Sequence, residues 1–79
     1  MDVKLKIGLR IKALREIAKM SQKDLSYASD LDRSYIASIE NGKRNVSIVN
    51  IEKIATALNV TLKDFFDDAE FTKYSRGSK

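Results

Sequence analysis

The chain contains no cysteine, no histidine and no proline, and glycine occurs only three times. The missing cysteine and histidine exclude the usual zinc sites and the Cys/His or Ser-His-Asp arrangements of nucleophilic enzymes. No glycine-rich loop of the phosphate-binding type is present either. We therefore expect a protein that is not an enzyme, with no catalytic residue, no metal site and no cofactor.

One acidic cluster, formed by Asp64, Asp67, Asp68 and Glu70, could be considered as a carboxylate metal site. Runs of charge are usually solvated faces of helices, and we interpret this one in that way.

Long apolar runs are also missing, because charged residues interrupt every segment before it reaches the ~18 residues of a transmembrane span. No secretion signal with a small-residue cleavage site is recognisable. The 79 residues suit a single domain, which we place at residues 1–74, with a flexible tail at 75–79. We expect a cytoplasmic protein that does not interact with a membrane.

Positive charge is concentrated in the N-terminal half of the chain. Residues 1–44 hold ten Lys/Arg and six Asp/Glu, whereas residues 45–79 hold five of each, and the net charge is +4. A basic half beside a neutral half indicates contact with a polyanion through one half only.

The scarcity of chain-breaking residues and the many good helix formers predict an all-α fold. Apolar spacing and capping residues place five helices at about 4–18, 22–29, 33–41, 48–58 and 62–72. The expected N-caps are Ser21, Asp32, Ser47 and Thr61. The pair Asn41-Gly42 is a typical helix stop. Ile48 is expected inside, together with Ile51 and Ile54.

The second and third helices, joined by a short turn, match the helix-turn-helix plan. In that plan the N-terminal part of the second helix of the pair faces base edges in the DNA major groove. The residues there that we expect to contact bases are Arg33, Ser34, Ala37 and Ser38. Arginine can bind guanine through two hydrogen bonds, and the alanine methyl can touch thymine. The alternative is that these are ordinary surface residues.

A second group of residues flanks this helix and could contact phosphates. It consists of Gln22, Tyr35, Asn41, Lys43, Arg44 and Asn45. The alternative for the basic pair is a favourable interaction with the helix C-terminus. For Tyr35 the alternative is packing against the core.

The segment "MSQKDLSYASDLDRSYIASIENGKRN" resembles the Cro/C1-type helix-turn-helix domain of phage repressors and small bacterial regulators. The resemblance covers roughly residues 7–68 and implies the five-helix, lambda-repressor-like fold. It also implies a buried ion pair between Arg15 and Glu40, which we therefore expect to be structural.

Within that family, "LSYASDLDRSYIASIENGKRN" followed by "DFF" is most similar to restriction–modification controller proteins. The resemblance implies a homodimer that binds double-stranded DNA at a palindromic operator. It also implies a dimer interface in the last two helices, formed by residues such as Ile48, Val49, Ile51 and Phe65. RNA polymerase is a further candidate partner. A phage-type repressor, an antitoxin and a helical protein-interaction module are the alternatives.

The chain departs from the family pattern at the ends of its first two helices. Glycine is usual where this chain has Lys19, so the first helix either ends differently or holds a strained lysine. Glycine is also frequent at the position of Asp30, but aspartate tolerates left-handed geometry better than most residues.

Overall fold

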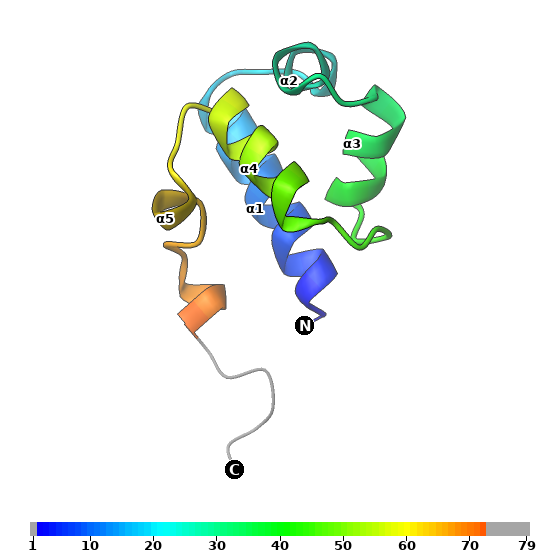
Figure 1. The fold of residues 1–79 in the computed structure, drawn as a ribbon. Helices are drawn as coiled ribbons and strands as arrows, with labels where there is room; N and C mark the ends of the chain where they lie inside the picture. Colours follow the sequence, from blue (N-terminus) through cyan, green and yellow to red (C-terminus); the bar gives the residue numbers. More distant parts are fainter. Residues whose placement is uncertain (1, 73–79) are drawn as a thin grey trace.

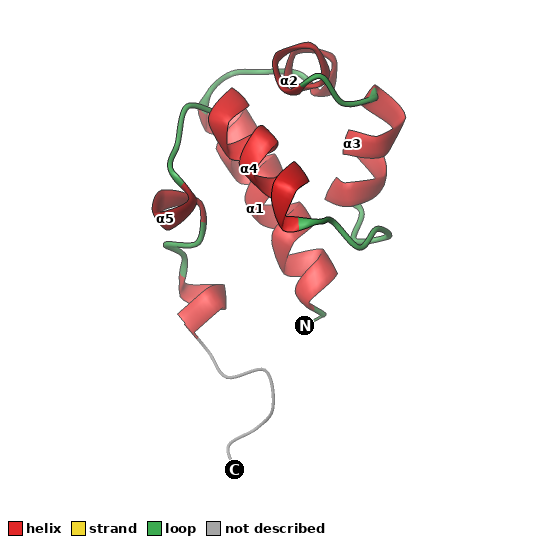
Figure 2. Ribbon diagram, in the orientation of Figure 1, coloured by secondary structure: helices red, strands yellow, loops and turns green. Residues whose placement is uncertain are grey.

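The computed structural model describes residues 2–72, and within this range every regular element is helical (Figures 1 and 2). The helices are α1 (Val3–Ile17), α2 (Gln22–Ser29), α3 (Arg33–Glu40), α4 (Ile48–Ala57) and α5 (Leu62–Phe65), followed by a 3₁₀ turn, Ala69–Thr72. The predicted five-helix, all-α fold is confirmed. The domain limit at residue 74 and the tail at 75–79 lie outside the described residues.

A single core joins the five helices. Its buried members are Ile7, Ile11, Leu25, Ile36, Ile39, Ile51, Ile54, Ala55, Leu58 and Phe65. Helix α1 packs against α3, α2 packs against both α3 and α4, and α4 packs against α5. Figure 1 shows α3 and α5 on opposite sides of α4. No described helix is long and apolar enough to cross a lipid bilayer.

Helices α1 and α3 approach each other closely at Gly8. A Cβ atom built on Gly8 would lie 2.2 Å from the carbonyl oxygen of Ile39 and 2.9 Å from that of Glu40. Glycine is therefore required at this point of α1, because any side chain would push the C-terminal end of α3 away.

The helix ends follow the predicted capping residues in most cases. The side chains of Ser21, Ser47 and Thr61 each accept a hydrogen bond from the backbone N–H three residues later. Asp32 occupies the predicted N-cap position of α3, but its side chain makes no capping bond. Lys19 follows Ala18, the C-cap residue of α1, with a φ of 59°, so the predicted strained lysine is confirmed.

The fifth helix is shorter than predicted, because α5 ends at Phe65 instead of continuing to residue 72. The Arg10 guanidinium donates to the carbonyl oxygens of Phe65 (2.7 Å), Asp64 (2.8 Å) and Asp67 (3.4 Å). It also pairs with the Asp68 carboxylate at 3.5 Å. A longer helix would have used the carbonyls of Asp64 and Phe65 in its own ladder, whereas here a side chain from α1 binds them.

Candidate DNA-binding interface

The turn between α2 and α3 sets the position of the candidate recognition helix. Asp30 ends α2 in the left-handed conformation with φ 59°. The Ser26 hydroxyl donates to the Leu31 carbonyl oxygen across the turn. The hydroxyl of Ser26 thus contributes a hydrogen bond that an alanine at this position could not make. These local contacts fix the direction in which α3 leaves α2.

The predicted base-contacting residues lie on the side of α3 that is not used for the core. Arg33 and Ser34 are exposed at the N-terminal end of the helix, and Ala37 and Ser38 are half-buried one turn later. Ile36 and Ile39 are fully buried on the opposite side. The structure therefore brings the four residues together on one polar strip at the start of α3.

The segment after α3 carries most of the predicted phosphate-contacting residues. Asn41 is the C-cap residue of α3, and Gly42 continues the turn with φ +74°. Asn41, Lys43, Arg44 and Asn45 are all exposed. A Cβ atom on Gly42 would come within 3.1 Å of Leu5, so the turn packs tightly on α1 while its basic side chains face solvent.

Tyr35 belongs to both the core and the surface. Its half-buried ring packs against the hydrophobic core, and its hydroxyl accepts a 2.9 Å hydrogen bond from Asn50 Nδ2 on α4. The Arg44 guanidinium carbon lies 5.0 Å from the ring centroid, in cation–π contact. The contact of Asn50 with Tyr35 was not predicted from the sequence. The signal that could have indicated it is an amide side chain within the otherwise apolar stretch Ile48–Ile51.

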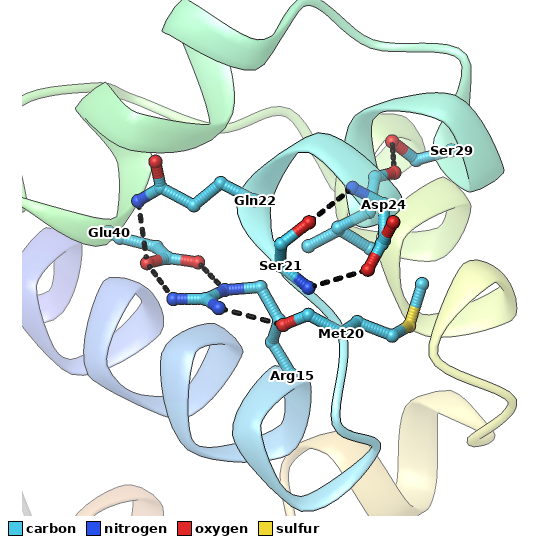
Figure 3. Close-up of polar contacts among 8 residues, drawn as sticks. Arg15, Met20, Ser21, Gln22, Asp24, Ser29 and Glu40 are labelled. Atoms are coloured by element: carbon cyan, nitrogen blue, oxygen red, sulfur yellow. Dashed lines mark hydrogen bonds and ion pairs between the residues drawn. The ribbon is translucent and has the colours of Figure 1, made fainter.

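The C-terminal end of α3 is tied to α1 by an ion pair between Arg15 and Glu40 (Figure 3). Arg15 Nε and Nη2 donate to the two carboxylate oxygens at 2.7 and 3.0 Å, and Nη1 donates to the Met20 carbonyl at 2.8 Å. The hydrogen bond to Glu40 raises the pKa of Arg15 above its usual value, so the guanidinium stays charged. The expected structural ion pair is present in the geometry that favours strong pairing.

Gln22 also belongs to this network, in addition to its predicted role at phosphates. Its Nε2 atom donates to Glu40 Oε1 at 3.1 Å, which links the first residue of α2 to the last residue of α3 (Figure 3). One amide hydrogen remains for an external contact. Phosphate binding by Gln22 stays a prediction.

The predicted dimer-interface residues divide into two groups. Ile48 and Val49 are each 60% exposed at the start of α4, so Ile48 is not the core residue that its spacing predicted. Ile51 and Phe65 are 7% and 0% exposed within the chain itself. These two pack in the core and expose little or no surface in this conformation, and their place in a dimer interface stays a prediction.

This architecture defines a class of protein: a helical domain whose two-helix unit presents a polar helix face beside a basic loop. The helix-turn-helix family model matches residues 11–65, and the chain belongs to this family. Within it, identities of 50% and 45% to two control proteins and of 46% to a restriction–modification controller protein show that the chain belongs to the control proteins of restriction–modification systems.

Relatives and solved structures support this assignment. The chain is 50% identical over 70 residues to control protein C.MunI of a Mycoplasma species, covering 87% of this chain and 95% of the relative. The controller protein C.AhdI from Aeromonas hydrophila is 46% identical, with a TM-score of 0.77 over 80% of this chain and 96% of that structure. The C.Esp1396I tetramer in complex with its 35 base-pair operator is 39% identical, with a TM-score of 0.81 over 85% and 88%.

Proposed function

We propose that this protein binds a palindromic DNA operator as a homodimer and regulates transcription as a restriction–modification controller. The observation that carries the proposal is the polar strip at the start of α3, with Arg33 and Ser34 exposed and a basic turn following the helix. Two recognition helices about 34 Å apart would fit successive major grooves of a symmetric site. Such a role would place the protein in the cytoplasm with the DNA.

Base recognition is assigned to Arg33, Ser34, Ala37 and Ser38, and Arg33 is the side chain with the most specific pairing chemistry. Selection of bound duplexes from a random-sequence pool would give the operator, its symmetry and its half-site spacing in one experiment. A palindrome with half-sites about one helical turn apart is expected. Recovery of no preferred sequence would contradict the proposal.

Arg33→Ala tests the reading role directly on the selected duplex. The expected loss is about 1–3 kcal/mol of binding free energy, concentrated at one base pair in each half-site. Fluorescence-anisotropy titrations on the selected duplex and on single-base variants measure it. Unchanged affinity and unchanged base preference would remove Arg33 from the reading residues.

Lys43→Ala tests the phosphate group of residues. Loss of one phosphate contact should weaken binding on all sequences and reduce the slope of log K against log salt by about 0.9. Lys63→Ala on α5 is the matched control, because Lys63 is an exposed lysine on an element away from α3 in Figure 1. An equal effect of both variants would indicate a general charge effect instead of a local contact.

For dimerisation, Ile48 and Val49 remain the proposed contacts, because each leaves a large apolar side chain mostly in solvent. Ile48→Asp combined with Val49→Asp should shift the molecular mass toward that of a monomer in analytical ultracentrifugation. Contact with RNA polymerase stays a prediction.

A further inference from the structure

The contacts of Tyr35 assign a role to Asn50, a residue that lies on α4 and outside the polar strip of α3. Asn50 is the third residue of α4, and its backbone N–H donates to the Ser47 side chain at 3.1 Å. Its side-chain Nδ2 donates to the Tyr35 hydroxyl oxygen at 2.9 Å. The capping bond at the start of α4 thus fixes the backbone of Asn50, and the Asn50 side chain in turn fixes the position of the Tyr35 hydroxyl.

A phenol has one proton to donate and an oxygen that can accept. Because the Tyr35 oxygen accepts from Asn50, its own proton must point in another direction. No protein oxygen within residues 2–72 takes that proton in a hydrogen bond. The hydroxyl therefore has a donor directed away from Asn50 and available to an outside acceptor.

A positive charge lies over the ring that carries this donor. The Arg44 guanidinium stacks on the Tyr35 ring at 5.0 Å from its centroid, and Arg44 is otherwise exposed. A donor hydrogen and a cation placed side by side are complementary to an anionic oxygen. On a protein that binds duplex DNA, the anions in reach of a helix flank are backbone phosphates.

We propose that Asn50 is a positioning residue for DNA binding: it holds the Tyr35 hydroxyl as an acceptor, so that the phenol donates to an operator phosphate beside Arg44. Asn50 itself contacts no DNA in this arrangement. The proposal rests on the proposed function, and it deepens that function by adding a residue that acts only through another.

The test is a double-mutant cycle on the full chain, with the duplex selected from the random pool by the wild-type protein. Asn50→Ala and Tyr35→Phe should each weaken binding about three- to tenfold, as expected for one lost or misdirected hydrogen bond. Asn50→Ala made in the Tyr35→Phe background should have no further effect, because no hydroxyl remains to be positioned. Additive losses would overturn the proposal.

Three readouts separate positioning from a merely structural role. Asn50→Ala and Tyr35→Phe should each weaken binding by the same factor on the selected duplex as on duplexes with a single base pair changed, since phosphates carry no sequence information. The salt slope should stay unchanged for Asn50→Ala but fall by about 0.9 for Arg44→Ala, because only the arginine displaces a counterion. Asn50→Asp should weaken binding more than Asn50→Ala, because a carboxylate would accept the hydrogen bond of the phenol O–H and repel phosphate.

Unchanged affinity of Asn50→Ala would overturn the proposal while leaving the proposed function intact. Absence of DNA binding by the wild-type chain would instead contradict the proposed function itself. Losses confined to one base pair would overturn the phosphate assignment and place Tyr35 among the base-reading residues.

Discussion

The two arginines of α1 hold two different parts of the molecule by different means. Arg15 pairs with a carboxylate that is 3% exposed, and so ties α1 to the end of α3. Arg10 binds three backbone carbonyls and the more exposed Asp68, and so ties α1 to the end of α5. A buried carboxylate has no substitute partner when its arginine is removed, whereas carbonyls near the surface can be hydrated. We therefore expect removal of Arg15 to destabilise the fold strongly at the end of α3, and removal of Arg10 to loosen only the end of α5.

The largest effect is expected for Arg15→Ala. Stranding the charge of Glu40 should lower the free energy of unfolding by about 3–5 kcal/mol, measured by urea denaturation. The control is the pair of variants Glu40→Ala and Arg15→Ala/Glu40→Ala. The double variant should lose less than the sum of the two single losses. Strict additivity would mean that the two side chains do not depend on each other.

Arg10→Ala should cost less, about 1–2 kcal/mol, because the carbonyls it leaves can bind water. Hydrogen exchange should show faster opening in residues 62–72 and little change in α2 and α3. Arg10→Lys offers one donor group in place of the planar fork and should recover only part of the loss. A loss as large as that of Arg15→Ala would remove the distinction between the two ends.

Lys19→Gly should stabilise the fold at the connection from α1 to α2, where the backbone leads to Met20, whose carbonyl Arg15 binds. Lys19 has φ 59°, which costs a residue with a Cβ about 1–2 kcal/mol, and the greater freedom of glycine in the unfolded chain cancels part of the gain. We expect a net gain of about 0.5–1 kcal/mol. Lys12→Gly, in the middle of α1, is the matched control and should instead destabilise by about 1 kcal/mol.

The smallest effect is expected at the start of α2. Ser21 N–H donates to the Asp24 carboxylate at 2.9 Å, and this bond lowers the pKa of Asp24 below its ordinary value of 3.8. A depressed pKa in the folded state gives stability that is present above pH 3.8 and lost as the pH falls through the lower folded value.

Asp24→Asn should therefore be less stable than the wild type at neutral pH, with the difference shrinking below pH 3.8 in urea melts. Asp64→Asn at the start of α5 is the control. There Asp64 N–H donates to the Thr61 side chain, and the described structure lacks the reciprocal bond. A constant difference between Asp24→Asn and wild type across this pH range would remove the capping bond as its cause.

The sequence predicted those structural features that depend on residues within one or two helical turns of each other. The limits of α1 to α4 to within one residue, the caps at Ser21 and Ser47, the stop at Asn41-Gly42 and the polar strip of α3 all depend on local pattern, and each is present. The carbonyls at the end of α5 are bound by Arg10, which is 54 residues from Asp64 in the chain, and no local pattern reports such a contact. Family resemblance predicted the Arg15–Glu40 pair, which local periodicity alone does not indicate.

The candidate DNA-binding interface, like the fold, was predictable only where it depends on local sequence pattern. Exposure of Arg33, Ser34 and Lys43 agrees with the predicted contact roles, which themselves stay proposals. Ile51 and Phe65 lie in the core of the chain, and the sequence could not separate the two roles, because an apolar residue on a helix suits a dimer interface and a core equally well. The bond from Asn50 to Tyr35 joins two helices whose relative position only the folded chain defines.

The tight seam at Gly8 also bears on how such a protein can change its target. Because α3 is held there by backbone contact, by the ion pair at Glu40 and by buried isoleucines, the exposed Arg33 and Ser34 of its outward strip are not needed to hold it, whereas Ala37 and Ser38 are half-buried. Arg33 and Ser34 can therefore be exchanged freely, and Ala37 and Ser38 for residues of similar size, without disturbing the frame behind them. The same frame could carry a different quartet to a different operator, which makes this domain a practical starting point for retargeted regulators.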